Sequence, residues 1–341
     1  MRQPRLFITG VGPVSPIGIG WDAVRTALAE KRSGIGPITL FDASGLPVRA
    51  AAEVKGFDPK KMTKARKQLK VMARDAQLGV ASARFAAEHG KFTPGSVPPE
   101  RVGVVFGADR ICGPLEDSEP PYRACMENGR FHFERWATDG FAATFPLSFL
   151  KVLPNMIGSH ISITLDARGP NNTIHHAEVS STLAVAEAAR VLRRGNADLV
   201  VTGGAGAQVS PYDWVRHCVM GRLSADADNT PRPFAPDRNG EVRGEAAVSC
   251  LLETEQSVEA RGVEPLAELL GTGAAFSGRR VGGPKAALVR AIRAALDQAG
   301  IEADALGGVI AHGWATQADD PVEAAALAEV VPGIPVTAPS S

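Results

Sequence analysis

The chain has 341 residues, of which 44% are hydrophobic and 22% charged, and its formal net charge is zero. This balance is typical of a globular protein with a sizeable core, and it disfavours a general binder of nucleic acid or of membrane surfaces. No apolar run reaches the roughly 18 to 20 residues that span a bilayer, and the first residues do not resemble a signal peptide. The four scattered cysteines favour free thiols over disulfides or a zinc site, so we expect a soluble cytoplasmic protein without a bound metal.

Strand-like apolar runs alternate with helical patterns along most of the chain, which predicts an α/β fold with buried, mostly parallel strands. The expected elements of the first part are a strand at 6–11, helices at 21–31 and 71–89, a strand at 102–106, a helix at 178–194, and strands at 199–202 and 246–253. Arginines in its last turn and a following glycine, Gly195, are typical of the end of the 178–194 helix.

After about residue 256 a similar order of elements recurs, with a helix expected at 284–299 and a strand at 308–311. This recurrence predicts two related α/β halves, at 1–255 and 256–341, which pack as one body because no low-complexity linker separates them. The region 112–150 is rich in proline, aromatic and charged residues and breaks the rhythm of strands and helices. It is interpreted as an inserted cap or interface segment.

Two glycine clusters follow expected strands. In the first, ITGVGPVSPIG at residues 8–18, Pro13 and Pro16 stand where a phosphate-binding helix would have to begin, and no complete dinucleotide fingerprint is present. In the second, at 203–206, the lysine of a phosphate-binding loop is missing. Tight turns explain both clusters better than nucleotide binding does.

Three histidines are candidate ligands. His175 and His176 are adjacent, so on a helix their side chains point apart, and a packed polar pair is favoured over a metal site. His312 ends the strand-like run VIAH, at the edge where α/β sheets place groups that face ligands. By itself it is as compatible with a structural role as with a functional one.

A basic stretch, KKMTKARKQLK at residues 60–70, carries six positive charges. Most such runs are solvated helix faces. In an otherwise neutral protein this one could instead bind an acidic partner. The six side chains are Lys60, Lys61, Lys64, Arg66, Lys67 and Lys70.

Four motifs follow one another along the chain: ITGVGPVSPIG, GPNNTIHHAEVSSTLAVAEAAR, RPFAPDRNGEVRGEAA and AHGWATQADDPVEAAAL. Together they resemble the β-ketoacyl (acyl-carrier-protein) synthases, the condensing enzymes of fatty acid and polyketide synthesis. The resemblance covers nearly the whole chain apart from about 112–145. It implies a thiolase-like fold, in which two related α/β halves form a layered α-β-α-β-α body, and a dimer with a second copy or with a competent ketosynthase.

In the family, a nucleophilic cysteine stands between the G-P-N turn and the S-S pair, and here that position is Glu178. Ser180 and Ser181 match the family's own serines, so neither is a relocated nucleophile. Condensation needs a thiolate that holds the acyl chain as a thioester. A carboxylate at a helix N-terminus gains about 0.3–1 kcal/mol from the dipole, but it is a weak nucleophile and its acyl anhydride would hydrolyse. We therefore expect no condensation by the usual route.

Relatives with glutamine at this position have two roles, as chain-length-factor subunits or as decarboxylases of malonyl-carrier protein. The leading hypothesis is a non-condensing protein that binds acyl or malonyl groups on a carrier protein, as partner of an active synthase. The alternative is a malonyl decarboxylase or other acyltransferase-type enzyme, in which Glu178 is a general acid or base, kept protonated by burial beside Ala177 and Val179. In the third interpretation Glu178 only fills a disused pocket and bonds to His312.

The resemblance also assigns other residues. His312 matches the first active-site histidine, which stabilises an oxyanion. In the family pattern H-G-T-G-T, Trp314 and Ala315 replace threonine and glycine and Thr316 is kept, so Trp314 and Thr316 are expected to line the substrate channel. The basic stretch is expected to face the acidic acyl carrier protein, whose phosphopantetheine makes a separate cofactor unnecessary.

The family's lysine, second histidine and glycine-rich segment would follow the last residues of this chain, with Ser340 near the lysine's place. We therefore expect the C-terminal half to be incomplete, because a missing sheet edge would leave apolar surface uncovered.

Overall fold

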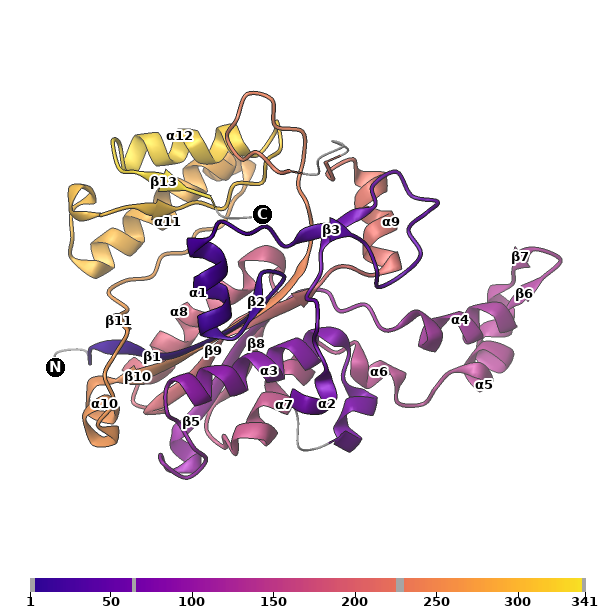
Figure 1. Ribbon diagram of the computed structural model, residues 1–341, viewed down its shortest axis with the longest axis horizontal. Helices are drawn as coiled ribbons and strands as arrows, with labels where there is room; N and C mark the ends of the chain where they lie inside the picture. Colours follow the sequence, from indigo (N-terminus) through magenta and orange to yellow (C-terminus); the bar gives the residue numbers. More distant parts are fainter. Residues whose placement is uncertain (1–3, 63–65, 225–229, 339–341) are drawn as a thin grey trace.

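The computed structural model of the protein describes residues 4–62, 66–224 and 230–338 (Figure 1). A seven-stranded sheet lies at its centre, in the order β11-β1-β10-β9-β5-β8, with β2 paired to β1. Its strands are β1 (Leu6–Ser15), β2 (Gly18–Ile19), β5 (Val102–Ala108), β8 (Asn171–Ile174), β9 (Leu199–Ala207), β10 (Glu245–Thr254) and β11 (Ala267–Glu268).

The expectation of mostly parallel strands is wrong. In the central sheet only the pairs β9–β5 and β5–β8 are parallel, whereas β1 runs antiparallel to β2, β10 and β11, and β10 runs antiparallel to β9. The sequence predicted the strands themselves because continuous apolar runs report burial on both faces of a sheet. Burial does not report direction: in β10 the successive residues Leu251 and Leu252, which point to opposite faces, are both buried although both neighbouring strands are antiparallel to it.

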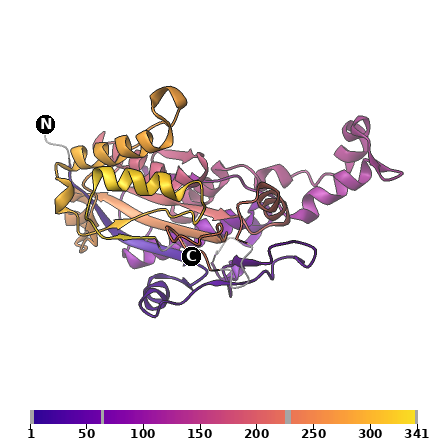
Figure 2. The ribbon, with the colours of Figure 1, turned by 90° about the horizontal axis from the view of Figure 1, so that it is seen from above.

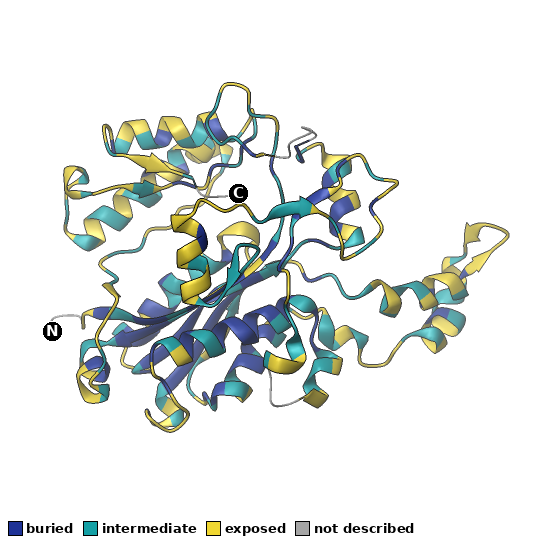
Figure 3. Cartoon of the chain, in the orientation of Figure 1, coloured by how far each residue is buried: buried dark blue, intermediate teal, exposed yellow. Residues whose placement is uncertain are grey.

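Helices cover both faces of the sheet (Figures 1 and 2). Two of them, α3 (Arg74–His89) and α7 (Asn155–Leu165), pack on one face, where the larger apolar cluster lies. A third, α8 (Ser180–Arg193), packs on β5 and β9 from the other side, over a cluster rich in alanine and valine. Figure 3 shows this buried centre in dark blue. The predicted helices at 71–89 and 178–194 are thus confirmed with slightly shorter bounds.

The first glycine cluster serves close packing. A Cβ on Gly10 would overlap the backbone oxygen of Ala86 in α3, and one on Gly12 would overlap that of Ser82. The Ser82 hydroxyl also donates a hydrogen bond of 2.6 Å to the carbonyl of Gly12. Glycine is needed here because the strand and the helix backbone touch directly.

The same contact recurs in the second half. Gly271 and Gly273 lie against α11 (Gly283–Ala299), where added Cβ atoms would overlap the carbonyl oxygens of Ala295 and Ala291. In both places a G-x-G pair meets two carbonyls four residues apart on a long helix. This repeated packing relates the two halves of the chain structurally.

The second half contains α11, α12 (Asp320–Val330) and a two-stranded parallel sheet of β12 (Val309–Ile310) and β13 (Val336–Thr337). The predicted helix at 284–299 and the strand near 308–311 are both present. The remaining elements are α1 (Trp21–Ala29), β3 (Ile35–Pro37), β4 (Ala50–Ala52), α2 (Pro59–Met62), η1 (Arg66–Val71), η2 (Pro99–Arg101), η5 (Ala177–Val179), α9 (Pro211–Met220), α10 (Glu255–Arg261), η6 (Arg279–Val281) and η7 (Ala303–Ala305).

The predicted insert is an arm that extends away from the body (Figures 1 and 2). It contains α4 (Leu115–Ala124), β6 (Met126–Glu127), β7 (Arg130–Phe131), η3 (Phe133–Arg135), η4 (Trp136–Gly140) and α5 (Phe141–Ala143), and the chain then returns to the body at α6 (Ser148–Lys151), which contacts η1. Its own small aromatic cluster joins Tyr122, Phe131 and Trp136, while Phe133 and Phe141 are largely exposed. In the described part of the chain, no helix combines the length and apolar character that crossing a bilayer requires.

Candidate functional site

Glu178 lies on the short turn η5 between β8 and α8, two residues before the helix begins. The turn is held by Ser180, whose hydroxyl donates to the carbonyl of Ala177 at 2.6 Å and accepts from the backbone N–H of His176 at 2.8 Å. Ala177 has a φ of 48°, in the left-handed region that residues with a side chain rarely adopt. Such local strain is common where a fold has to point one side chain at a site.

Two glycines let this turn approach the sheet. A Cβ on Gly107 of β5 would lie 2.5 Å from the backbone nitrogen of Ser181, and one on Gly204 of β9 would lie 2.7 Å from the Ser181 Cβ. The first turn of α8 therefore rests directly on the carboxyl ends of two parallel strands. Sites in α/β folds form at such edges, where several strand ends converge.

The carboxylate of Glu178 pairs with Arg243, which stands just before β10. The distance from Arg243 Nη2 to Glu178 Oε1 is 3.4 Å. The Glu178 side chain is 39% exposed and that of Arg243 only 11%. Ala177 and Val179 are exposed as well, so the burial that was expected to keep Glu178 protonated is absent from this structure. The suggested bond to His312 is replaced by the bond to Arg243.

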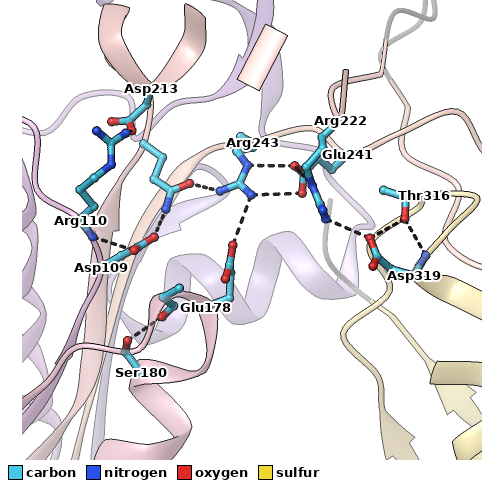
Figure 4. A network of polar contacts seen from close by, with 12 residues as sticks. Asp109, Arg110, Glu178, Ser180, Asp213, Arg222, Glu241, Arg243, Thr316 and Asp319 are labelled. Atoms are coloured by element: carbon cyan, nitrogen blue, oxygen red, sulfur yellow. Dashed lines mark hydrogen bonds and ion pairs between the residues drawn. The ribbon is translucent and has the colours of Figure 1, made fainter. Parts of the chain in front are cut away.

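Arg243 belongs to a network of polar contacts at the ends of several strands (Figure 4). On one side it donates to the side-chain oxygen of Gln208, which in turn donates to Asp109. On the other side its Nε lies 3.1 Å from Glu241 Oε1. Arg222 then joins Glu241, at 3.2 Å, to Asp319, at 3.1 Å. The network thus connects the two halves of the chain through alternating charges.

Two cavities meet at this network. The larger, of about 640 Å³, lies over the ends of β5, β9 and β10 and includes Glu178, His312 and Trp314 in its lining. The smaller, of about 370 Å³, is polar and extends towards α9. The side chains and backbone that line both are those of Asp109, Ala177, Glu178, Gln208, Arg243 and Trp314. The ion pair of Glu178 and Arg243 is therefore part of the wall between the two cavities.

His217 of α9 lines the smaller cavity. Burial lowers the pKa of its imidazole to about 4, and the nearby cation of Arg243 adds to this effect. The ring is therefore neutral near pH 7. It adds no positive charge to a cavity in which arginines and carboxylates alternate.

His312 and Trp314 were expected at the site, and the structure places both on the larger cavity. The backbone N–H groups of His312 and Gly313 donate to the carboxylate of Glu323, at 2.8 and 2.9 Å. These bonds fix the backbone turn after β12. The imidazole of His312 takes no part in them. The His312 side chain is exposed and lies against the Trp314 indole.

Thr316 was expected to line the substrate channel, but it is absent from the lining of both cavities in the described structure. Its hydroxyl donates to Asp319 at 2.8 Å and accepts from the Asp319 backbone N–H at 3.0 Å. Thr316 thus holds the turn before α12 and the end of the polar network.

The thiols of Cys250 and Cys112 are poorly suited to act as nucleophiles. All four cysteines are free thiols, and Cys250 of β10 lines the larger cavity. Burial raises the pKa of Cys250 to about 12. Burial, with a further contribution from Asp213, raises the pKa of Cys112 to about 11. Both remain protonated near pH 7 and are weak nucleophiles.

The described part of the basic stretch lies on α2 and η1. Five of its six cations, Lys60, Lys61, Arg66, Lys67 and Lys70, are exposed. Lys64 lies outside the described residues. In the part of the chain that is described, no ion pair joins any of the five to an acidic side chain. Their charges are therefore available to a partner, as well as to solvent.

Sequence reasoning missed Arg243, Gln208, Glu241 and Arg222. The signal was present in RNGEVRGEAA, where Glu241 and Arg243 alternate immediately before a strand at the same sheet edge as Glu178. His175 and His176 are exposed. The described residues include no group of three or more His, Cys, Asp or Glu side chains arranged to hold a metal ion.

Known proteins share both the sequence and the fold. Residues 3–257 match the family description "Beta-ketoacyl synthase, N-terminal domain", and residues 266–338 match "Beta-ketoacyl synthase, C-terminal domain". The chain is 28% identical to "3-oxoacyl-[acyl-carrier-protein] synthase 2" of Synechocystis sp., over 97% of this chain and 78% of that protein.

Two solved structures have the same fold. "The ishigamide ketosynthase/chain length factor" is 29% identical, with a TM-score of 0.83, over 99% of this chain and 80% of the other. A β-ketoacyl synthase from Burkholderia phymatum is 26% identical, with a TM-score of 0.84, over 98% of this chain and 80% of the other. The resemblance seen in the sequence and the thiolase-like fold are thereby confirmed.

Proposed function

Because this chain belongs to the β-ketoacyl synthase family, we propose that it acts in acyl-chain biosynthesis as a non-condensing member. In this role it binds acyl or malonyl groups delivered by an acyl carrier protein and works beside an active synthase, in the manner of a chain length factor. One of the similar structures is named as a ketosynthase/chain length factor, which makes such a partnership a reasonable proposal for this chain.

One observation carries the proposal. The residue that precedes α8 at the cavity is a carboxylate engaged by Arg243, and the thiol that lines the same cavity, Cys250, has a pKa raised to about 12 by burial. Acyl transfer to the protein needs an ionised, accessible nucleophile with a stable thioester product. Neither group supplies one, so the cavity is suited to holding an acyl group and unsuited to forming a covalent acyl intermediate.

The acyl acceptor can be tested by intact-protein mass spectrometry after incubation with hexanoyl-carrier protein. We expect the natural chain to keep its mass and Glu178→Cys to gain one hexanoyl group. Glu187→Cys, the same substitution further along α8, is the matched control and should gain none. A hexanoyl adduct on the natural chain would contradict the proposal. Sedimentation of the chain alone and mixed with an active synthase of the same source tests the partnership.

A malonyl decarboxylase is the second candidate, since Glu178 and His312 line one cavity. The bond between the methylene carbon and the malonyl carboxylate would break to release CO₂, His312 would stabilise the enolate oxygen, and the enolate carbon would take a proton from water to give the acetyl thioester. Malonyl-carrier protein incubated with the natural chain, Glu178→Gln and Glu178→Ala distinguishes the candidates. Conversion to the acetyl form that is lost in Glu178→Ala would establish the enzyme, and no conversion in any of the three would exclude it.

A further inference from the structure

We propose that Arg243 is the binding residue for the carboxylate of a small ligand in the larger cavity. Glu178 is then an internal competitor, which occupies the guanidinium until the ligand carboxylate displaces it. The inference deepens the proposed function by assigning a substrate class, acyl groups with a terminal carboxylate. It rests on that function only in taking the ligand to be an acyl thioester.

The guanidinium of Arg243 is fixed in place before any ligand arrives. Gln208 accepts from one of its nitrogens, and Glu241 lies 3.1 Å from its Nε. The side chain is only 11% exposed. A guanidinium held rigidly on two edges loses little further freedom when it binds an anion, which favours recognition of a carboxylate.

The remaining nitrogen, Nη2, is shared between Glu178 Oε1, at 3.4 Å, and Glu241 Oε2, at 3.5 Å (Figure 4). The contact of 3.4 Å is long for a charge-assisted hydrogen bond, which is usually about 2.7–2.9 Å. The Glu178 side chain is partly exposed and stands on a short turn, so its carboxylate can rotate towards solvent without disturbing the core. In this ion pair the Glu178 carboxylate is free to move, whereas the Arg243 guanidinium is held in place.

Charge explains why a ligand would displace Glu178 instead of binding beside it. Arg243 already has two carboxylate neighbours, Glu178 and Glu241, and Glu241 shares its charge with Arg222. A third carboxylate at Arg243 would be repelled while Glu178 remained. Exchange of one carboxylate for another at Nη2 keeps the number of anions in contact with Arg243 constant, so the geometry of the new contact decides which carboxylate is bound.

The surroundings favour a ligand with an apolar body. Apart from Arg243 and its neighbours, the larger cavity is lined mainly by small apolar residues and glycines of β5, β9, β10 and α8, among them Ala205, Val185 and Val248. An acyl chain would be accommodated there by apolar contact. A terminal carboxylate would find in Arg243 a cation on the wall, in surroundings that strengthen the attraction relative to water.

Equilibrium binding of pantetheine thioesters tests this inference without requiring turnover. The probes are malonyl-, succinyl- and glutaryl-pantetheine, each compared by isothermal titration calorimetry with its terminal carboxamide. We expect at least one probe to bind about tenfold more tightly than its carboxamide, as a charged hydrogen bond predicts. Glu178→Gln should bind that probe a further two- to fivefold more tightly, about the strength of an exposed ion pair, with no change for the carboxamide.

Glu187→Gln removes a carboxylate from α8, away from Arg243, and should bind as the natural chain does. Arg243→Gln should abolish the preference for the carboxylate; if this variant does not fold, Arg243→Lys, which keeps the charge but loses the planar donor fork, should weaken that preference. Equal affinities for acid and amide in both the natural chain and Glu178→Gln would overturn the inference. The inference would also be overturned if no probe bound to the natural chain or to Glu178→Gln. A failure here, with no acyl adduct and a demonstrated synthase partner, would leave the proposed function intact.

Discussion

The imidazole of His312 lies against the indole of Trp314, with ring centroids 4.1 Å apart and planes inclined by 44°. The guanidinium of Arg222 also packs on that indole, 4.8 Å from the ring centroid. Trp314 therefore links the histidine at the cavity to the arginine that joins Glu241 and Asp319. Its replacement should disturb the orientation of His312 and the stability of the fold together.

For Trp314→Ala we expect a loss of about 1–3 kcal/mol in the free energy of unfolding, from lost packing and a lost cation–π contact. Trp314→Phe keeps an aromatic face and should lose less than about 1 kcal/mol. Urea unfolding followed by circular dichroism measures both. An alanine variant as stable as the natural chain would show that the stacking of Arg222 on Trp314 contributes nothing.

For Gly12→Ala we expect a loss of more than about 2 kcal/mol, because the new methyl group overlaps the α3 backbone at Ser82 and neither element can move away cheaply. Gly45→Ala is the matched control, since its Cβ would meet nothing within 4 Å. Thermal unfolding of the two variants beside the natural chain gives the comparison. Equal melting temperatures for both variants would contradict the close approach of β1 and α3.

Asp75 should make stability depend on pH. Burial raises its pKa from 3.8 to about 7, although it accepts a hydrogen bond from the backbone N–H of Ala207, and Asp213 and Glu245 add to the rise. A raised carboxyl pKa means that the folded state binds the proton more tightly than the unfolded state. Its contribution is therefore fully present below about pH 4 and is lost as the pH rises towards 7, by up to about 4 kcal/mol.

Asp75→Asn removes this titration and keeps an acceptor for Ala207. Relative to the variant, the natural chain should lose unfolding free energy between pH 4 and pH 7. Asp22→Asn, at an exposed position, should follow the natural chain at every pH. Parallel curves for the natural chain and Asp75→Asn would show that Asp75 is already ionised in this range.

Reversal of the exposed basic surface should weaken binding of an acidic carrier protein. For a chain with Lys60→Glu, Lys61→Glu and Lys67→Glu we expect at least about tenfold weaker binding at low salt, a difference that shrinks in 0.5 M NaCl. Surface plasmon resonance with immobilised carrier protein measures both. The control reverses three exposed cations elsewhere, Arg25, Arg279 and Arg280. Equal loss in both chains would place the docking surface elsewhere.

The sequence predicted the elements near the site better than the contacts within it. Glu178 and His312 could be placed because each stands next to a strongly patterned strand or helix, and the structure brings both to one cavity. The predicted end of α8 was nearly right because Arg193 lies in the last turn of the helix and Gly195, with a positive φ, follows it. The direction of β10 was not predictable, since an apolar run is compatible with either direction.

The partner of Glu178 could not be predicted, because Arg243 is 65 positions away and comes close only because β8 ends and β10 begins at the same edge of the sheet. The burial expected around Glu178 failed for a related reason. The apolar neighbours Ala177 and Val179 indicate burial in a regular helix, but on the turn that precedes α8 both face outwards. Where the backbone is irregular, the periodicity of the sequence no longer indicates the direction of the side chains.

The position of β1 has a consequence for biosynthesis. This strand leaves the ribosome well before β10, its longest pairing partner, and Leu6 meets Thr254 in the register. At about 5–20 residues per second, roughly 12 to 50 s separate the synthesis of the two strands. During that interval α3 can cover one face of β1, while the edge that β10 will occupy stays open. Chaperones should therefore be needed to cover the open edge of β1 until β10 has emerged. A translational pause before that point would favour aggregation.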